Sequence, residues 1–309
     1  MNTDNKTEQQ NTEAANPIDH DIFIIGGGIN GCGIARDAAG RGYSVFLCEA
    51  DDLASGTSSQ STKLIHGGLR YLEHYEFKLV REALTEREIL WRVAPHIIHP
   101  MRFILPYHKG LRPWWLLRVG MFIYDHLGGR KKLPASNAIN LSDNEEGACL
   151  KQNFEKALEY SDCWVNDSRL VVLNAMDAHE YGATIKTQHK CIGMKRHADH
   201  WSLTLENQLT KATEIVTAKV VINAAGPWVD DVLQNKFKLN TPKQITHVKG
   251  SHFVVPKIHS DDYAYLLQHD DGRVIFVLPF MQSYSLIGTT DVCEDKGIDH
   301  LSISKAKIE

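Results

Sequence analysis

Residues 21–50 read DIFIIGGGINGCGIARDAAGRGYSVFLCEA, and this stretch decides the fold. The apolar run 23–25 predicts a buried strand, and Gly26, Gly28 and Gly31 follow it with the spacing G-x-G-x-x-G. A helical stretch comes next and leads to a second apolar run, 45–47, which is followed shortly by Glu49. Strand, glycine turn, helix and strand in this order predict a βαβ unit that binds a dinucleotide.

Each part of this unit has a physical reason. Gly26 permits the tight turn out of the strand, Gly28 lets backbone N–H groups approach a diphosphate, and Gly31 lets helix and strand pack closely. The diphosphate then lies at the positive end of the helix dipole. Glu49 can accept hydrogen bonds from ribose hydroxyls, and its charge would repel a 2′-phosphate, which argues against NADP. NAD and FAD both stay open at this point.

Length, composition, net charge and cysteine pattern limit the classes of protein to which this sequence can belong. The chain has 309 residues, 43% of them hydrophobic, which suffices for one large domain or two ordinary ones. Its net charge of -4 argues against a nucleic-acid partner. The six cysteines form no C-x-x-C pair, so no metal site is expected. The polar residues 1–17 predict a disordered tail and not a signal peptide, and no run of 18 apolar residues predicts a membrane-spanning helix.

The stretch 57–73, TSSQSTKLIHGGLRYLE, gathers hydroxyls, cations and glycines. Hydroxyl donors beside a diphosphate suit a long, extended cofactor such as FAD, and the planar guanidinium of Arg70 could bind a substrate phosphate or carboxylate. His66 precedes Gly67 and Gly68, and a histidine near a redox ring could take the proton of an alcohol. The residues alone leave an ordinary solvated loop as an equal alternative.

Further along the chain, helical periodicity gives way to alternation. Helices are predicted over 76–94 and over 167–188, the second opened by Asp167 and Ser168 as a cap. A βαβ unit followed by antiparallel strands predicts an α/β protein with two intertwined sheets. The predicted strands are 201–206, an apolar strand within 218–228 that runs into a Gly-Pro turn, a hairpin over 264–279, and 284–291.

Two of these strands run into small residues. Ala225-Gly226 and Gly288-Thr289 permit the backbone to pass close to a ligand, although a packing contact or a simple turn gives the same pattern.

The segment 112–132, RPWWLLRVGMFIYDHLGGRKK, combines paired tryptophans, an apolar run and flanking cations. Its cations could meet anionic headgroups while Trp114, Trp115 and Phe122 enter the membrane interface. A buried helix with a basic end explains the same residues, and both interpretations stay open.

Several stretches together resemble one known family. They are IIGGGINGCGIARDAAGRGYSVFLCE, SSQSTKLIHGGLRYLEHYEFKLVREALTERE, MRFILPYH, EYSDCWVNDSRLV, NAAGPWVD and the set KGSHFVVP, IFVLPF and IGTTD. The family is the FAD-dependent, quinone-linked glycerol-3-phosphate dehydrogenase, within the D-amino-acid-oxidase-like flavoproteins. The resemblance implies an α/β fold of the glutathione-reductase-2 (D-amino-acid-oxidase) type. In this fold a Rossmann-like FAD-binding domain is interleaved with an antiparallel-sheet substrate domain.

The resemblance also implies a division of the chain. The FAD-binding domain would take residues 18–95, 161–234 and the return over 286–309, and the substrate domain would take 96–160 and 235–285. Members of the family continue beyond the length of this chain, so we expect the C-terminal remainder of the family to be absent here.

Site residues follow from the resemblance as well. Arg70 and Tyr71 would face the substrate, with Arg70 on its phosphate, and His66 is the candidate base. The cofactor, FAD, would be bound by Gly26, Gly28, Ile29, Asn30, Gly31, Glu49, Thr57, Ser58, Ser59, Lys63, Leu64, His66, Gly67, Gly68, Ala225, Gly226, Trp228, Gly288 and Thr289.

The reaction implied is oxidation of sn-glycerol 3-phosphate to dihydroxyacetone phosphate, with electrons passed to a membrane quinone. This places the protein in the cytoplasm, peripheral on the cytoplasmic face of the inner membrane, and it could form a homodimer. Two alternatives stay open: an amino-acid or amine oxidase of the same fold, and a non-catalytic flavin-binding remnant.

Overall fold

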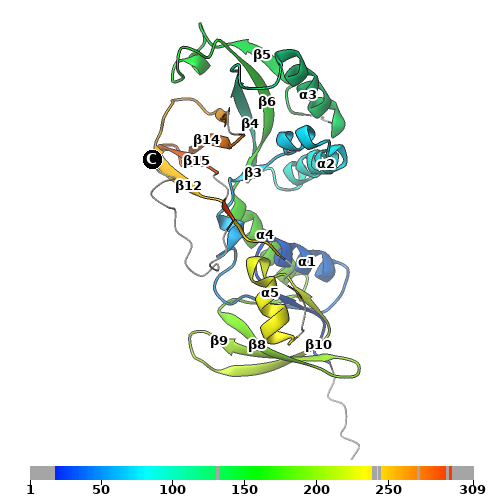
Figure 1. Ribbon diagram of the computed structural model, residues 1–309. Helices are drawn as coiled ribbons and strands as arrows, with labels where there is room; N and C mark the ends of the chain where they lie inside the picture. Colours follow the sequence, from blue (N-terminus) through cyan, green and yellow to red (C-terminus); the bar gives the residue numbers. More distant parts are fainter. Residues whose placement is uncertain are drawn as a thin grey trace, which may run out of the picture.

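The computed structural model describes residues 18–129, 132–238, 242, 245–269, 272–289 and 292–293. The tail predicted over 1–17 and most of the predicted return to the FAD-binding domain lie outside the described residues. Two main sheets, each with its own helices, follow one another along an elongated molecule (Figure 1).

The first sheet has six strands in the order β7-β2-β1-β10-β9-β8. Strand β1 runs parallel to both β2 and β10, whereas β9 and β8 form an antiparallel extension. Helices α1 (Ile29–Gly40) and α4 (Asp167–Glu180) pack together on one face. The strands are β1 (His20–Ile25), β2 (Val45–Cys48), β7 (Thr184–Lys186), β8 (His189–Arg196), β9 (Trp201–Asn207) and β10 (Thr213–Asn223).

Close contact between α1 and the end of β1 confirms the predicted βαβ unit. A Cβ atom on Gly31 would lie 1.9 Å from the carbonyl oxygen of Gly26, so only glycine allows this approach. Gly26 itself has a φ of +112°, and its own Cβ would meet the carbonyl oxygen of Ala224 at 2.5 Å. Three chain segments therefore meet where the first strand ends.

The second sheet has eight strands and carries α2 (Phe77–Val93) and α3 (Trp114–Leu127) on one face. Its order is β12-β15-β14-β13-β4-β6-β3, with β5 paired to β6, and only β13 and β4 are parallel. The strands are β3 (Leu64–Ile65), β4 (Ile98–Pro106), β5 (Asn137–Asn140), β6 (Lys156–Val165), β12 (His252–Pro256), β13 (Ala264–Gln268), β14 (Val274–Phe280) and β15 (Tyr284–Gly288).

Shorter elements complete the chain. They are the 3₁₀ helices η1 (Thr57–Ser59), η2 (Leu69–His74), η3 (Glu145–Gly147) and η4 (Gly226–Trp228), the helix α5 (Val229–Asp231), the π-helix η5 (Val232–Lys236) and the strand pair β11 (Val248–Lys249) with β16 (Val292–Cys293).

Most elements agree with the sequence predictions. The helix predicted over 76–94 is α2, the alternating strand over 201–206 is β9, and the predicted hairpin is β13 with β14. The third strand predicted over 284–291 is β15, which ends at Gly288. The domain boundaries stay a prediction, and β3 of the segment 18–95 lies in the second sheet.

One helix prediction was wrong at both ends. Helix α4 is capped by Asn166, whose side chain accepts a hydrogen bond from the Arg169 N–H, and not by Asp167 and Ser168. The carboxylate of Asp167 is engaged elsewhere in the fold, as described below. The helix ends at Glu180 because Gly182 takes a φ of +90°, and residues 184–186 then pair with β2 as β7.

The α1 contact predicts opposite effects for two glycines of the same helix. Gly31→Ala forces the contact with Gly26 apart and should destabilise the protein by about 1–3 kcal/mol, the cost of overpacking. Gly33→Ala is the matched control, because its Cβ would meet no atom within 4 Å. It should stabilise the protein by up to about 1 kcal/mol through helix propensity. Urea midpoints measure both, and equal shifts of the same sign would contradict the packing argument.

Candidate functional site

The N-terminus of α1 is built to accept an anion. Its N-cap is Gly28, which offers no side-chain hydrogen bond, and its first turn contains no acidic residue. Ile29 and Asn30 are exposed, and the Ile29 N–H donates to the Ser58 hydroxyl at 3.0 Å. The backbone amides and the helix dipole here therefore suit a diphosphate, as the sequence predicted.

Glu49 lies just beyond the end of β2, beside this helix end. One carboxylate oxygen accepts from the Gly27 N–H at 2.6 Å and the other from the Asp51 N–H at 2.9 Å. Each oxygen keeps further acceptor capacity for a ribose hydroxyl, because a carboxylate offers about four acceptor sites. The carboxylate is thus held in place while it can still bind a sugar.

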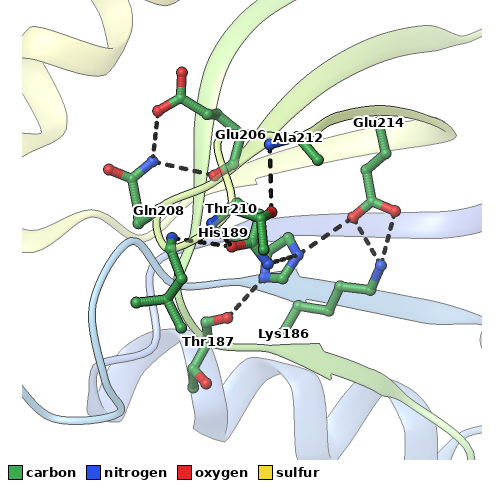
Figure 2. Close-up of polar contacts among 10 residues, drawn as sticks. Lys186, Thr187, His189, Glu206, Gln208, Thr210, Ala212 and Glu214 are labelled. Atoms are coloured by element: carbon green, nitrogen blue, oxygen red, sulfur yellow. Dashed lines mark hydrogen bonds and ion pairs between the residues drawn. The ribbon is translucent and has the colours of Figure 1, made fainter.

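The segment 186–189 flanks Glu49 and was missed from the sequence. The Glu49 N–H donates to the Lys186 carbonyl at 2.9 Å, and the His189 N–H donates to the Glu49 carbonyl at 2.8 Å. Figure 2 shows the Lys186 ammonium directed at both carboxylate oxygens of Glu214, at 2.7 and 2.8 Å. We did not identify this segment from the sequence because the helix predicted over 167–188 extends into it.

Two loops complete the surroundings of the helix end. The Ala224 N–H donates to the Ile25 carbonyl at 2.9 Å, which sets the backbone of Ala225 and Gly226 beside the glycine turn. A Cβ atom on Gly56 would lie 3.3 Å from the Trp228 ring, so η1 and η4 approach each other.

Lys63 ties the hydroxyl-rich loop to α4. Its ammonium donates to Asp167 Oδ1 at 2.8 Å and to the Ser59 carbonyl at 3.2 Å, while the Ser61 hydroxyl donates to Asp167 Oδ2 at 2.8 Å. The Lys63 and Asp167 side chains are only 17% and 9% exposed. The charge of Lys63 therefore serves to hold the loop, a role that the sequence did not reveal.

A second contact joins this loop to the end of β15. The Thr62 hydroxyl lies 2.9 Å from His252 Nε2, and a Cβ atom on Gly288 would lie 2.4 Å from the His252 ring. The next hydroxyl, Thr289 Oγ1, is buried and has no hydrogen-bond partner in the described part of the chain. A buried hydroxyl of this kind fits a wall that contacts a polar ligand. His252 stands in the stretch KGSH, which the resemblance included without assigning a role.

A cleft of about 650 Å³ opens between the segment 66–77, α3 and the β13–β14 hairpin. It is lined by His66, Gly68, Arg70, Tyr71 and Thr289 among the predicted site residues. Two further guanidinium groups line it, those of Arg112 and Arg273. Arg112 lies 3.8 Å from Glu73, which also lines the cleft.

Hydrogen bonds to buried side chains hold the turn that carries His66. The Gly67 N–H donates to the Tyr124 hydroxyl at 2.8 Å, and that hydroxyl contacts both carboxylate oxygens of Asp162 at 2.8 and 3.0 Å. Arg87 donates to Asp162 Oδ1 at 2.6 Å. Burial raises the pKa of Asp162, against which the Arg87 charge acts, and burial raises the pKa of Tyr124 well above its usual range.

The structure thus gathers the predicted residues into two groups. Around the α1 N-terminus lie Gly26, Gly28, Ile29, Asn30, Gly31, Glu49, Thr57, Ser58, Ser59, Ala225, Gly226 and Trp228. The cleft is lined by His66, Gly68, Arg70, Tyr71 and Thr289. The neighbouring Gly67 faces the core, where its N–H donates to the Tyr124 hydroxyl. Lys63 and Leu64 lie between the two groups along the chain. Gly288 packs against the ring of His252, which also contacts the Thr62 hydroxyl next to Lys63. Among the described residues, no cluster of three or more metal-ligating side chains is present.

Helix α3 has one buried and one exposed face. Met121 and Tyr124 are in the core, whereas Trp115 is 66% and Phe122 is 62% exposed. Trp114 packs on Tyr107, with ring centroids 5.2 Å apart. No helix in the described part of the chain is long and apolar enough to cross a membrane. Arg130 and Lys131 of the predicted basic flank lie outside the described residues.

Fold and site define a dinucleotide-binding oxidoreductase architecture. The chain belongs to the FAD dependent oxidoreductase family, whose model matches residues 21–309. This match confirms the predicted fold class and the predicted cofactor, FAD.

Individual relatives refine the comparison. The chain is 53% identical over 272 residues to glycerol-3-phosphate dehydrogenase of Pseudomonas tolaasii, covering 88% of the chain and 52% of the relative. It is 51% identical over 295 residues to D-erythritol 1-phosphate dehydrogenase of Brucella abortus, covering 96% of the chain and 59% of the relative. The fold resembles the FAD complex of glycerol-3-phosphate dehydrogenase from Bacillus halodurans, with a TM-score of 0.71, 29% identity, and 94% and 51% coverage. The chain spans little more than half the length of these relatives.

Proposed function

We propose that the protein oxidises sn-glycerol 3-phosphate to dihydroxyacetone phosphate with FAD as cofactor. One observation carries the proposal: the segment 57–71 runs from the α1 N-terminus directly into the cleft lined by Arg70 and Tyr71. A cofactor held at the helix end and a substrate held by Arg70 would therefore share one fixed stretch of chain. When bound, FAD supplies the acceptor for the two electrons lost at the C2 carbon of the substrate.

The charges of the cleft favour a phosphate ester. Arg70, Arg112 and Arg273 line it, and guanidinium groups bind phosphate oxygens with two parallel hydrogen bonds. An amino-acid substrate would also need a carboxylate to bind its ammonium group. Glu73 lines the cleft, but its carboxylate lies 3.8 Å from the guanidinium of Arg112 and is thus already paired with a positive charge. A phosphorylated alcohol therefore suits the cleft better than the alternative amino-acid substrate.

A longer polyol phosphate is the second candidate substrate. The relative named D-erythritol 1-phosphate dehydrogenase is 51% identical to this chain and the glycerol-3-phosphate dehydrogenase is 53% identical, so the comparisons favour neither carbon number. The volume of about 650 Å³ leaves room for a fourth carbon.

Flavin reduction tests the function. We expect the purified protein with bound FAD to lose its flavin absorbance on anaerobic addition of glycerol 3-phosphate, because the substrate donates two electrons. D-erythritol 1-phosphate and a mixture of amino acids are the parallel additions. Faster bleaching by the four-carbon phosphate would select the second candidate, bleaching by amino acids would select the oxidase alternative, and a flavin that none of them reduces would favour the non-catalytic remnant.

Arg70 should contribute to substrate binding and little to cofactor binding. Arg70→Ala removes one charge-assisted contact, so KM for glycerol 3-phosphate should rise about 10- to 100-fold while the FAD content stays unchanged. Arg41→Ala is the matched control, since Arg41 forms an exposed pair with Asp37 in the first sheet's helix layer. An unchanged KM in the Arg70 variant would remove this residue from the substrate site.

We also propose a peripheral contact with the cytoplasmic face of the inner membrane, where a quinone would take the electrons. The exposed Trp115 and Phe122 on α3 support it, together with Arg118 one turn away. Indole rings favour the interfacial region of a bilayer, and cations favour its anionic headgroups.

Vesicle flotation tests the contact. The protein should float with vesicles of anionic phospholipid, and the double variant Trp115→Ser/Phe122→Ser should float at least tenfold less, because two exposed aromatic anchors are lost. Tyr181→Ser is the control, since Tyr181 is 61% exposed and follows α4, away from α3. If the unaltered protein stays at the bottom of the gradient, the membrane proposal fails.

A further inference from the structure

The tight turn between β7 and β8, residues 186–189, encloses the backbone of Glu49. Lys186 is the last residue of β7, and His189 is the first residue of β8. The Glu49 N–H donates to the Lys186 carbonyl at 2.9 Å, and the His189 N–H donates to the Glu49 carbonyl at 2.8 Å. These two backbone hydrogen bonds tie Glu49 to both ends of the turn.

The turn has a backbone conformation that needs support. Gln188 has a φ of +57°, a region that residues with a Cβ atom rarely adopt. Its N–H donates to the Asp51 carbonyl at 2.8 Å, and its carbonyl accepts from the Gln208 N–H at 2.8 Å. Within the turn, His189 Nδ1 lies 2.7 Å from the Thr187 carbonyl. Such a conformation persists only where its surroundings hold it, and here contacts on both sides do so.

Glu214 joins the side chains from the two ends of the turn. The Lys186 ammonium donates to both carboxylate oxygens of Glu214, at 2.7 and 2.8 Å, and His189 Nε2 lies 3.8 Å from one of them (Figure 2). Glu214 stands on β10, which is a sheet neighbour of neither β7 nor β8. A strand distant in the sheet order therefore sets where both ends of the turn lie.

A second ion pair of the same sheet has similar chemistry in a different place. The Lys219 ammonium donates to Asp21 at 2.7 Å, and the two side chains are 57% and 31% exposed. The side chains of Lys186 and Glu214 are 33% and 39% exposed. Asp21 lies near the start of β1, at the end of that strand away from the glycine turn. The Lys219 pair is therefore a matched control that lies away from Glu49.

We propose that Lys186 and Glu214 are positioning residues for Glu49. Their ion pair holds the turn 186–189, the turn holds the backbone of Glu49, and the Glu49 carboxylate is thereby set in advance for the ribose of FAD. The contact between Glu49 and the ribose belongs to the proposed cofactor site, and the positioning role rests on it. It does not rest on the identity of the substrate.

A cofactor analogue tests the contact on which this role depends. The flavin-free protein is titrated with FAD and with FAD that lacks the 2′-hydroxyl of its adenosine ribose, and flavin fluorescence gives each Kd. We expect the deoxyadenosine analogue to bind about 10- to 100-fold more weakly, because one charge-assisted hydrogen bond is lost. Equal Kd values would overturn the proposal, whether or not glycerol 3-phosphate reduces the flavin.

The variant Lys186→Ala tests the positioning role. Since a partly exposed ion pair contributes modestly, the Kd of FAD should rise about three- to fivefold, while that of the analogue stays within about twofold. The preference for FAD then shrinks, a change that a general loss of stability would not produce. Lys219→Ala should leave the preference unchanged. If Lys186→Ala weakens both ligands alike, or neither, Lys186 has no positioning role.

Two further variants show whether the effect passes through the ion pair. Lys186→Arg keeps a cation that can donate to both oxygens of Glu214, so the preference for FAD should be retained. Glu214→Gln should reduce the preference as Lys186→Ala does, and the double variant Lys186→Ala/Glu214→Gln should reduce it no further, because both changes remove one interaction. Fully additive losses in the double variant would contradict the proposal.

Discussion

The site depends on one antiparallel pairing, between the segment 61–67 and the junction of β6 with α4. Leu64 and Ile65 pair with Trp164 and Cys163, and the Val165 N–H donates to the Lys63 carbonyl at 2.9 Å. Two buried acids bracket this pairing. Asp167 holds the loop on the cofactor side through Lys63 and Ser61, and Asp162 holds the turn on the cleft side through Tyr124.

This arrangement links the two sheets by charge as well as by packing. Taking one partner from a buried ion pair costs about 3–5 kcal/mol, because the other charge is left without compensation. Both acids lie on one continuous stretch, five positions apart, where β6 ends and α4 begins. The stretch EYSDCWVNDSRLV therefore supports the site through these two acids. Tyr160 lines the cleft, and the residues of the stretch that follow Tyr160 do not.

The sequence predicted elements that depend on residues close together along the chain, and it did not predict contacts between residues far apart along the chain. The βαβ unit, α2 and the β13–β14 hairpin follow from spacing within a few residues. In contrast, Lys63 and Asp167 are 104 positions apart, and Gly67 and Tyr124 are 57 apart, so no periodicity could join them. The resemblance named the family that the comparisons show, but only the fold explains why Lys63 holds a loop and why His252 stands beside Gly288.

The glycine pair between His66 and Arg70 sets the geometry of recognition. Gly67 is confined by Leu84 and Tyr124, and Gly68 takes a φ of +68° that starts the 3₁₀ helix carrying Arg70. His66 and Arg70 therefore stand at the two ends of one turn whose backbone is closely packed. The backbone between them is held in place before a ligand binds, which reduces the entropy lost on binding. The opposite wall of the cleft is formed by residues of α3, β13 and β14, whose side chains are the ones that a fourth carbon would meet on that side.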